Sequence, residues 1–144
     1  MSGVFRSILA VVAGFVAASA IMMAVETVNG KILYPELGKS AAGVTDIQKI
    51  KEILASAPIG ALLVVLFGWG LGSFAGGFLT TLISRKPPGR PALVLGVLLT
   101  LAGVANNLML PPPMWFWLAT FVVFLPATYL GARLVPKKEP IQET

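Results

Sequence analysis

Few side chains in this 144-residue chain could do chemistry, and no histidine or cysteine is among them. Their absence excludes disulfides, thiolate nucleophiles, imidazole bases and the usual zinc ligands. Catalysis by paired carboxylates needs two acids close together, and no apolar stretch of the sequence holds two acids. We therefore expect a protein that is not an enzyme and that uses no metal and no cofactor.

The polar residues that could form a site lie at the ends of two apolar stretches. Glu26 lies about 27 Å along the first stretch, counted from Ile8 at the helical rise per residue. Asn107 lies about 24 Å along the third stretch, counted from Pro91, so both are expected at similar height near one membrane boundary. A carboxylate at that depth needs a partner, which an asparagine amide could supply. The candidate polar site comprises Glu26, Asn29, Asn106 and Asn107.

Two interpretations of Glu26 remain open. In the first, its carboxylate belongs to a proton- or cation-linked polar site just beneath the outer surface. In the second, it lies in the headgroup zone and holds the following loop through Lys31 or a backbone amide. The second is favoured, because a carboxylate at the membrane boundary is less costly than one at mid-span.

Four long stretches without charged residues must position these side chains. The chain is 56% hydrophobic and only 12% charged, and each stretch is long enough to cross a ~30 Å hydrocarbon core as a helix. The sequence therefore predicts an all-α membrane protein, a single transmembrane domain over 1–144 with four helices in an antiparallel bundle. The predicted spans are about 4–28, 58–84, 91–110 and 114–134, with a loop over 29–57 and a tail over 135–144.

The positive charges are distributed unequally between the two sides of these spans. The loop over 29–57 and its flanks carry four lysines against four acids, whereas the other seven cations face only two acids. Because cytoplasmic loops are enriched in Lys and Arg, we expect both termini in the cytoplasm and the loop outside. Basic residues that flank spans do not form a nucleic-acid patch, so no nucleic-acid partner is expected. The expected interface anchors are Arg85, Arg90, Arg133, Trp115 and Trp117.

The loop over 29–57 should contain one short amphipathic helix. Asn29-Gly30 is typical of a helix end, and the first half of the loop is expected to be irregular. Thr45 and Gln48 match a capping box, and apolar residues follow at helical spacing. A helix over about 46–56 is therefore predicted, lying on the outer end of the bundle or in the lipid interface.

Small residues recur every four positions in the second span. Gly68, Gly72 and Gly76 lie on one helix face, and the first span offers a matching row with Gly14 and Ala18. Such rows let two helix backbones approach closely in a membrane. The partner of this glycine row could lie in this chain or in another subunit, and packing within the chain is favoured.

Several local patterns together resemble an uncharacterised family of small four-span bacterial inner-membrane proteins. The resemblance covers nearly the whole chain, and it implies the four-span fold and an inner-membrane location but no activity. Its motifs are Glu26, Leu33-Tyr34-Pro35, Pro58, Trp69 with Gly76-Gly77, Asn106-Asn107-Leu108, Pro113 to Trp117, and Leu130 to Leu134.

Two function classes follow from these observations. The favoured one is an accessory or structural subunit that packs against lipid and against another membrane protein or a second copy of itself. The alternative is a small transporter or channel with a polar site at Glu26 and Asn107. Small four-span transporters that insert in both orientations need little charge bias, and the one-sided bias of this chain departs from that pattern.

Overall fold

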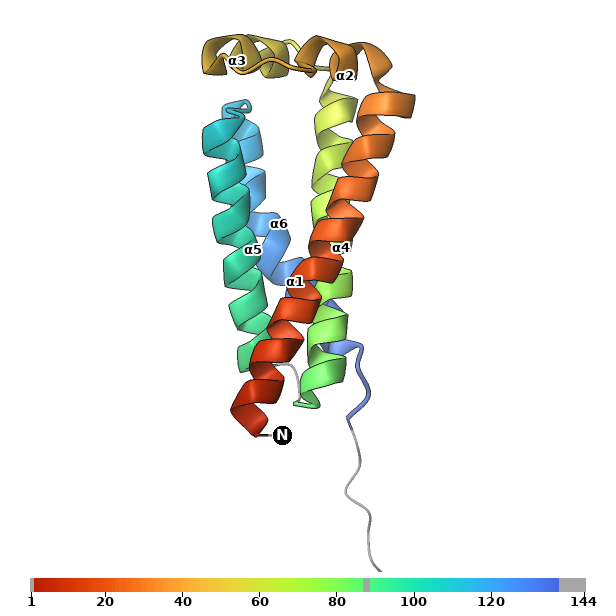
Figure 1. Cartoon of the computed structure of the whole chain (residues 1–144), viewed down its shortest axis with the longest axis vertical. Helices are drawn as coiled ribbons and strands as arrows, with labels where there is room; N and C mark the ends of the chain where they lie inside the picture. The colour runs from red at the N-terminus through yellow and green to blue at the C-terminus, as the bar shows by residue number, and fades with distance from the viewer. Residues whose placement is uncertain (1, 87–88, 138–144) are drawn as a thin grey trace, which may run out of the picture.

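The computed structural model describes residues 2–86 and 89–137, and every regular element in these ranges is a helix (Figure 1). Four of the helices are long and apolar enough to cross a membrane, which indicates a multi-pass membrane protein. The elements are α1 (Gly3–Val28), the π-helix η1 (Asn29–Leu33), α2 (Pro35–Ala41), α3 (Ile47–Ala55), α4 (Ile59–Ser84), α5 (Arg90–Met109) and α6 (Met114–Arg133).

The four long helices pack together, with α4 at the centre in contact with α1, α5 and α6. Figure 1 shows α2 and α3 lying across the end of the bundle opposite the N-terminus. We call this the α2–α3 end, and the opposite one the N-terminal end. The chain thus places the end of α1, the start of α4, the end of α5 and the start of α6 together beneath α2 and α3.

The contact between α1 and α4 is a close approach of two backbones. A Cβ atom built on Gly72 would lie 2.7 Å from the carbonyl oxygen of Ala18, and one on Gly76 would lie 2.8 Å from that of Gly14. Gly68 faces Val25 in the same way, at 2.8 Å from a side-chain methyl. The row of glycines on α4 therefore packs against α1 of the same chain, and no larger side chain fits there without separating the helices.

Two further contacts of the bundle, α4 with α6 and α5 with α6, use small residues as well. Gly77 of α4 lies against the backbone of Thr128 in α6, and Gly131 of α6 lies against the backbone of Phe74 in α4. Gly103 of α5 faces the ring of Phe124. Since lipid tails are as apolar as leucine, close packing of this kind holds membrane helices together where hydrophobic burial cannot.

The segment that follows α1 differs from the sequence prediction in two ways. The α-helix ends at Val28, the predicted bound of the first span, but the chain does not turn at Asn29-Gly30, because Asn29 keeps helical backbone angles and a π turn continues to Leu33. The first half of the loop is not irregular either, since Pro35–Ala41 forms α2 with proline in its first turn. In α3 the N-cap is Asp46, whose side chain accepts from the amide of Gln48, and not Thr45.

Cationic side chains gather at the N-terminal end. Arg6 donates from Nε to the carbonyl oxygen of Ile83 at 2.6 Å, and Lys86 donates to the hydroxyl of Ser7 at 3.2 Å, so the start of α1 is tied to the end of α4. Arg85 caps α4 with a left-handed backbone, and Arg133 ends α6 with its guanidinium 5.7 Å from the ring centre of Tyr129. Arg90 begins α5 at the same end. Trp115 and Trp117 lie at the start of α6, which is at the α2–α3 end. The part of the predicted tail beyond residue 137 lies outside the described residues.

Candidate functional site

All four residues of the candidate polar site line one cavity of about 260 Å³. Glu26 and Asn29 reach it from α1 and η1, and Asn106 and Asn107 reach it from the end of α5. Apolar residues of α2 and α3 form its roof, among them Leu37, Ala41, Ile50, Ile53 and Leu54. The ends of α1 and α5 lie at a similar height, as the helical rise predicts, and the four residues therefore meet at one cavity.

Asn29 is held by the π turn and by the start of α4. Its amide nitrogen donates to the carbonyl oxygen of Ala61 at 3.0 Å, and its side chain is only 5% exposed. The backbone nitrogen of Tyr34 donates to the Asn29 carbonyl at 2.7 Å, which is the five-residue spacing of a π turn. The side-chain oxygen Oδ1 of Asn29 is buried and has no hydrogen-bond partner among the described residues. π turns recur at functional sites because they redirect side chains within a helix.

Asn107 is the second buried amide of the cavity, at 1% exposure. Its nitrogen donates to the hydroxyl of Thr120 at 2.8 Å, and that hydroxyl donates to the carbonyl of Phe116, also at 2.8 Å. The sequence suggested that an asparagine amide could donate to Glu26, and the Asn107 nitrogen instead joins α5 to α6. Its Oδ1, like that of Asn29, is buried without a partner in the described ranges.

The carboxylate of Glu26 has a partner that sequence reasoning did not identify. Trp69 of α4 donates from its indole nitrogen to Oε1 of Glu26 at 3.0 Å. The indole is 3% exposed, stacks on Phe124 with ring centres 5.1 Å apart and meets Phe116 edge-on at 5.2 Å. A buried tryptophan normally needs a partner for its N–H group, and a single Trp69 in an apolar span is the signal that could have pointed to this contact.

No cation neutralises Glu26 within the described ranges. The salt bridge found there joins Lys39 to Glu36 at 3.1 Å on the exposed surface of α2, and Lys31 does not pair with Glu26. The idea that Lys31 ties Glu26 to the following loop is therefore not what the geometry shows. The indole of Trp69 supplies Glu26 with a hydrogen bond but no positive charge.

A second cavity, of about 210 Å³, shares Glu26, Trp69 and Asn106 with the first. It continues between α1 and α5 away from the α2–α3 end, and its other lining residues are almost all apolar. These are Phe15, Ser19, Met22, Met23, Leu99, Ala102, Gly103 and Phe124. The polar cavity therefore leads into an apolar groove, and Glu26 lies where the two meet.

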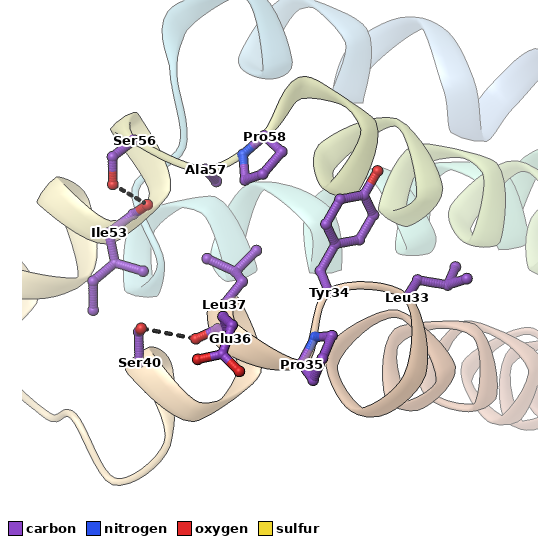
Figure 2. Close-up of a pocket in the computed structure, with 10 residues that line it drawn as sticks. All are labelled: Leu33, Tyr34, Pro35, Glu36, Leu37, Ser40, Ile53, Ser56, Ala57 and Pro58. Carbon is purple, nitrogen blue, oxygen red and sulfur yellow. Dashed lines mark hydrogen bonds between the residues drawn. The ribbon is translucent and has the colours of Figure 1, made fainter.

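A third pocket, of about 430 Å³, lies between α2 and the connection from α3 to α4 (Figure 2). Its acid, Glu36, is already paired with Lys39. The hydroxyls of Ser40 and Ser56 donate to carbonyls of their own helices. None of the buried polar atoms without partners in the described residues lines this pocket. The pocket therefore holds no buried polar atom in need of a partner, and the cavity at Glu26 is the better candidate.

Among the residues described here, no group of three or more His, Cys, Asp or Glu side chains is placed to hold a metal ion. Comparison with family models, with curated proteins and with solved structures finds no match to this chain. The resemblance to small four-span bacterial proteins therefore stands on its residues alone, while the four candidate spans stand on the structure.

Proposed function

We propose that this chain is a non-enzymatic multi-pass protein of a bacterial inner membrane that binds a small ligand in the cavity at Glu26. This is the transporter or channel class, and it takes precedence over the structural class favoured by the sequence. One observation carries the proposal. A single cavity gathers a carboxylate without a cation and two buried amide oxygens without partners in the described residues. Buried polar atoms are nearly always satisfied, so each exception needs an explanation, and a bound ligand is one that fits two such atoms at one cavity.

The proposed orientation places the cavity near the outer surface and the N-terminal end in the cytoplasm. Its support is the location of Arg6, Arg85, Lys86, Arg90 and Arg133 at the N-terminal end, combined with the positive-inside rule. In this orientation α2 and α3 cover the cavity from the outside. A ligand would then reach Glu26 from the outer leaflet or from the space beyond it.

Binding is tested by thermal unfolding of the purified protein in detergent, with a panel of small cations, anions and neutral amphiphiles. A ligand at a hundredfold excess over its Kd should stabilise the fold by about 2.7 kcal/mol. Ala41→Phe places a ring in the cavity from its roof and should abolish the stabilisation. Ala42→Phe is the matched control, because Ala42 is exposed and does not line the cavity. If no compound stabilises the protein, or if both variants respond equally, the cavity is not a binding site.

The accessory or structural subunit is the second candidate. It is favoured by the packing of α1, which buries only one face of the helix. The buried residues on this face are small and four positions apart: Ala10, Gly14 and Ala18. The opposite flank is exposed and apolar, and lipid, another membrane protein or a second copy of this chain could cover it. Mild solubilisation and native mass spectrometry distinguish the classes. A larger membrane protein retained in fixed stoichiometry supports the accessory role, and a chain that purifies alone contradicts it.

A further inference from the structure

Two residues that line the cavity, Asn29 and Asn107, each have a buried amide oxygen without a partner in the described residues. The amide atom of Asn29 that faces the Ala61 carbonyl must be its nitrogen, because a carbonyl oxygen only accepts. Thr120 gives its only hydroxyl hydrogen to the Phe116 carbonyl, so the Asn107 atom facing it must also be a nitrogen. One N–H group of each amide is thus bonded to a neighbouring helix, and both Oδ1 atoms are buried without partners in the described residues.

The charge of the cavity agrees with this pattern of acceptors. Glu26 uses one oxygen to accept from Trp69, and a carboxylate can accept several further hydrogen bonds. Trp69 and Phe116 also line the cavity, and aromatic rings attract organic cations. A divalent metal fits less well, because Ca²⁺ and Mg²⁺ prefer several carboxylate and water ligands, and Glu26 is the one acid among the described lining residues. The cavity is therefore suited to a cation that carries several N–H donors.

The adjoining apolar groove adds a requirement on the rest of the ligand. Phe15, Met22 and Leu99 extend the site from Glu26 along the space between α1 and α5. Such a surface accommodates a hydrocarbon chain, while the cavity beneath α2 and α3 accommodates a polar head. The meeting point of head and chain is Glu26, which lines both cavities.

We propose that this site binds the primary ammonium group of an amphiphile, with the ammonium at Glu26, Asn29 and Asn107 and the chain between α1 and α5. The inference rests on the ligand-binding function proposed above and names its ligand class. Two sources share this chemistry, a free amphiphilic amine and the headgroup of phosphatidylethanolamine. No Lys or Arg is among the described residues that line either cavity, so the site recognises the ammonium and not a phosphate.

Trp69 provides a reporter for the test. The chain has three tryptophans, and Trp115→Phe with Trp117→Phe leaves Trp69 alone beside Glu26. The full-length protein in dodecyl maltoside is titrated with octylammonium, octyltrimethylammonium and octanol while Trp69 emission is followed. Octylammonium should give a saturable change and bind about tenfold more tightly than the other two, because only it offers both charge and N–H donors. The trimethyl compound has the same chain and charge, and therefore controls for entry into the micelle.

Substitutions at Glu26 and Glu52 test whether the change in Trp69 emission comes from binding at Glu26. Glu26→Gln should weaken octylammonium binding about tenfold by removing the charge while keeping the shape. Glu52→Gln is the control, since Glu52 is exposed on α3 and lines neither cavity, and it should bind like the parent protein. Equal affinity for octylammonium and octanol would overturn the ammonium class while leaving a binding site in place. If no compound of this set or of the thermal panel binds, the proposed function fails too.

Lipid nanodiscs distinguish the two sources of the ammonium group, a free amphiphilic amine and the headgroup of phosphatidylethanolamine. With phosphatidylcholine, octylammonium should bind as it does in detergent. If phosphatidylethanolamine competes with octylammonium and remains bound in native mass spectra, the ammonium comes from the lipid headgroup. If it does not compete, the ligand is a free amphiphilic amine. A loss of octylammonium binding in both bilayers would overturn the inference.

Discussion

The indole nitrogen of Trp69 lies 3.0 Å from Oε1 of Glu26, and this hydrogen bond joins the centre of the bundle to the last turn of α1. Glu26 is exposed, whereas the indole is buried against Phe116 and Phe124. The position of Glu26 is therefore determined by the aromatic core and not by a surface cation.

Trp69→Phe tests this relationship. The ring contacts are largely kept, but the charge-assisted hydrogen bond is lost, and we expect the free energy of unfolding to fall by about 1–2 kcal/mol. Denaturant unfolding of Trp69→Phe, Glu26→Gln and the double variant gives the coupling between the two residues. Trp115→Phe, at an exposed position, is the control. Fully additive effects would show that the hydrogen bond contributes nothing to stability.

Gly72→Leu should damage the fold far more than Leu71→Ala. A leucine at residue 72 meets the Ala18 carbonyl and the Met22 side chain, and it must push α1 away from α4 at a cost of about 1–3 kcal/mol or more. Leu71 is 43% exposed, so its truncation should change stability by less than about 0.5 kcal/mol. Melting temperatures in detergent measure both. Similar temperatures for the two variants would show that the close approach is not important for stability.

Asn107→Leu should separate stability from binding. Leucine has a similar volume; it removes the hydrogen bond to Thr120 but also a buried acceptor that has no partner among the described residues, so the free energy of unfolding should fall by no more than about 1 kcal/mol. Octylammonium binding should be lost, because the amide oxygen is gone. Denaturant unfolding measures the stability of the variant, and Trp69 emission measures its binding of octylammonium. A large loss of stability would instead assign Asn107 a structural role between α5 and α6.

The proposed orientation is tested with single cysteines in a chain that has none of its own. Cysteines at Ser40, in α2, and at Lys137, beyond α6, are exposed and lie beyond opposite ends of the spans. In intact cells an impermeant maleimide should label position 40 and not position 137. The reverse pattern would invert the orientation, and equal labelling would indicate insertion both ways.

Much of the helical fold could be predicted from the sequence, because four charge-free stretches of membrane-crossing length leave little choice of structure. The segment over 29–41 could not, since local signals there compete with tertiary contacts. Asn29-Gly30 favours a helix end, but the buried hydrogen bond from Asn29 to Ala61 keeps the backbone helical.

The polar site, too, could be predicted only in part from the sequence. Helical rise is sufficient to place Glu26 and Asn107 at one level, and both line the cavity. Hydrogen-bond partners depend on rotation about the helix axes, which rise does not give. The bond from Trp69 to Glu26 and the one from Asn107 to Thr120 therefore became visible only in the structure.

The π turn at Asn29–Leu33 sets the direction in which the chain leaves α1 and enters α2. Its hydrogen bond spans five residues where an α-helix spans four, so the turn holds one residue more than an ordinary one. Deleting one residue from this turn would restore α-helical spacing, and because an α turn rotates the chain by about as much as the wider π turn, Tyr34 and α2 would keep nearly the same direction. The wider turn thus absorbs one extra residue, and a one-residue deletion here should disturb the cover over Glu26 less than a one-residue deletion inside α1, which would rotate everything that follows by about 100°.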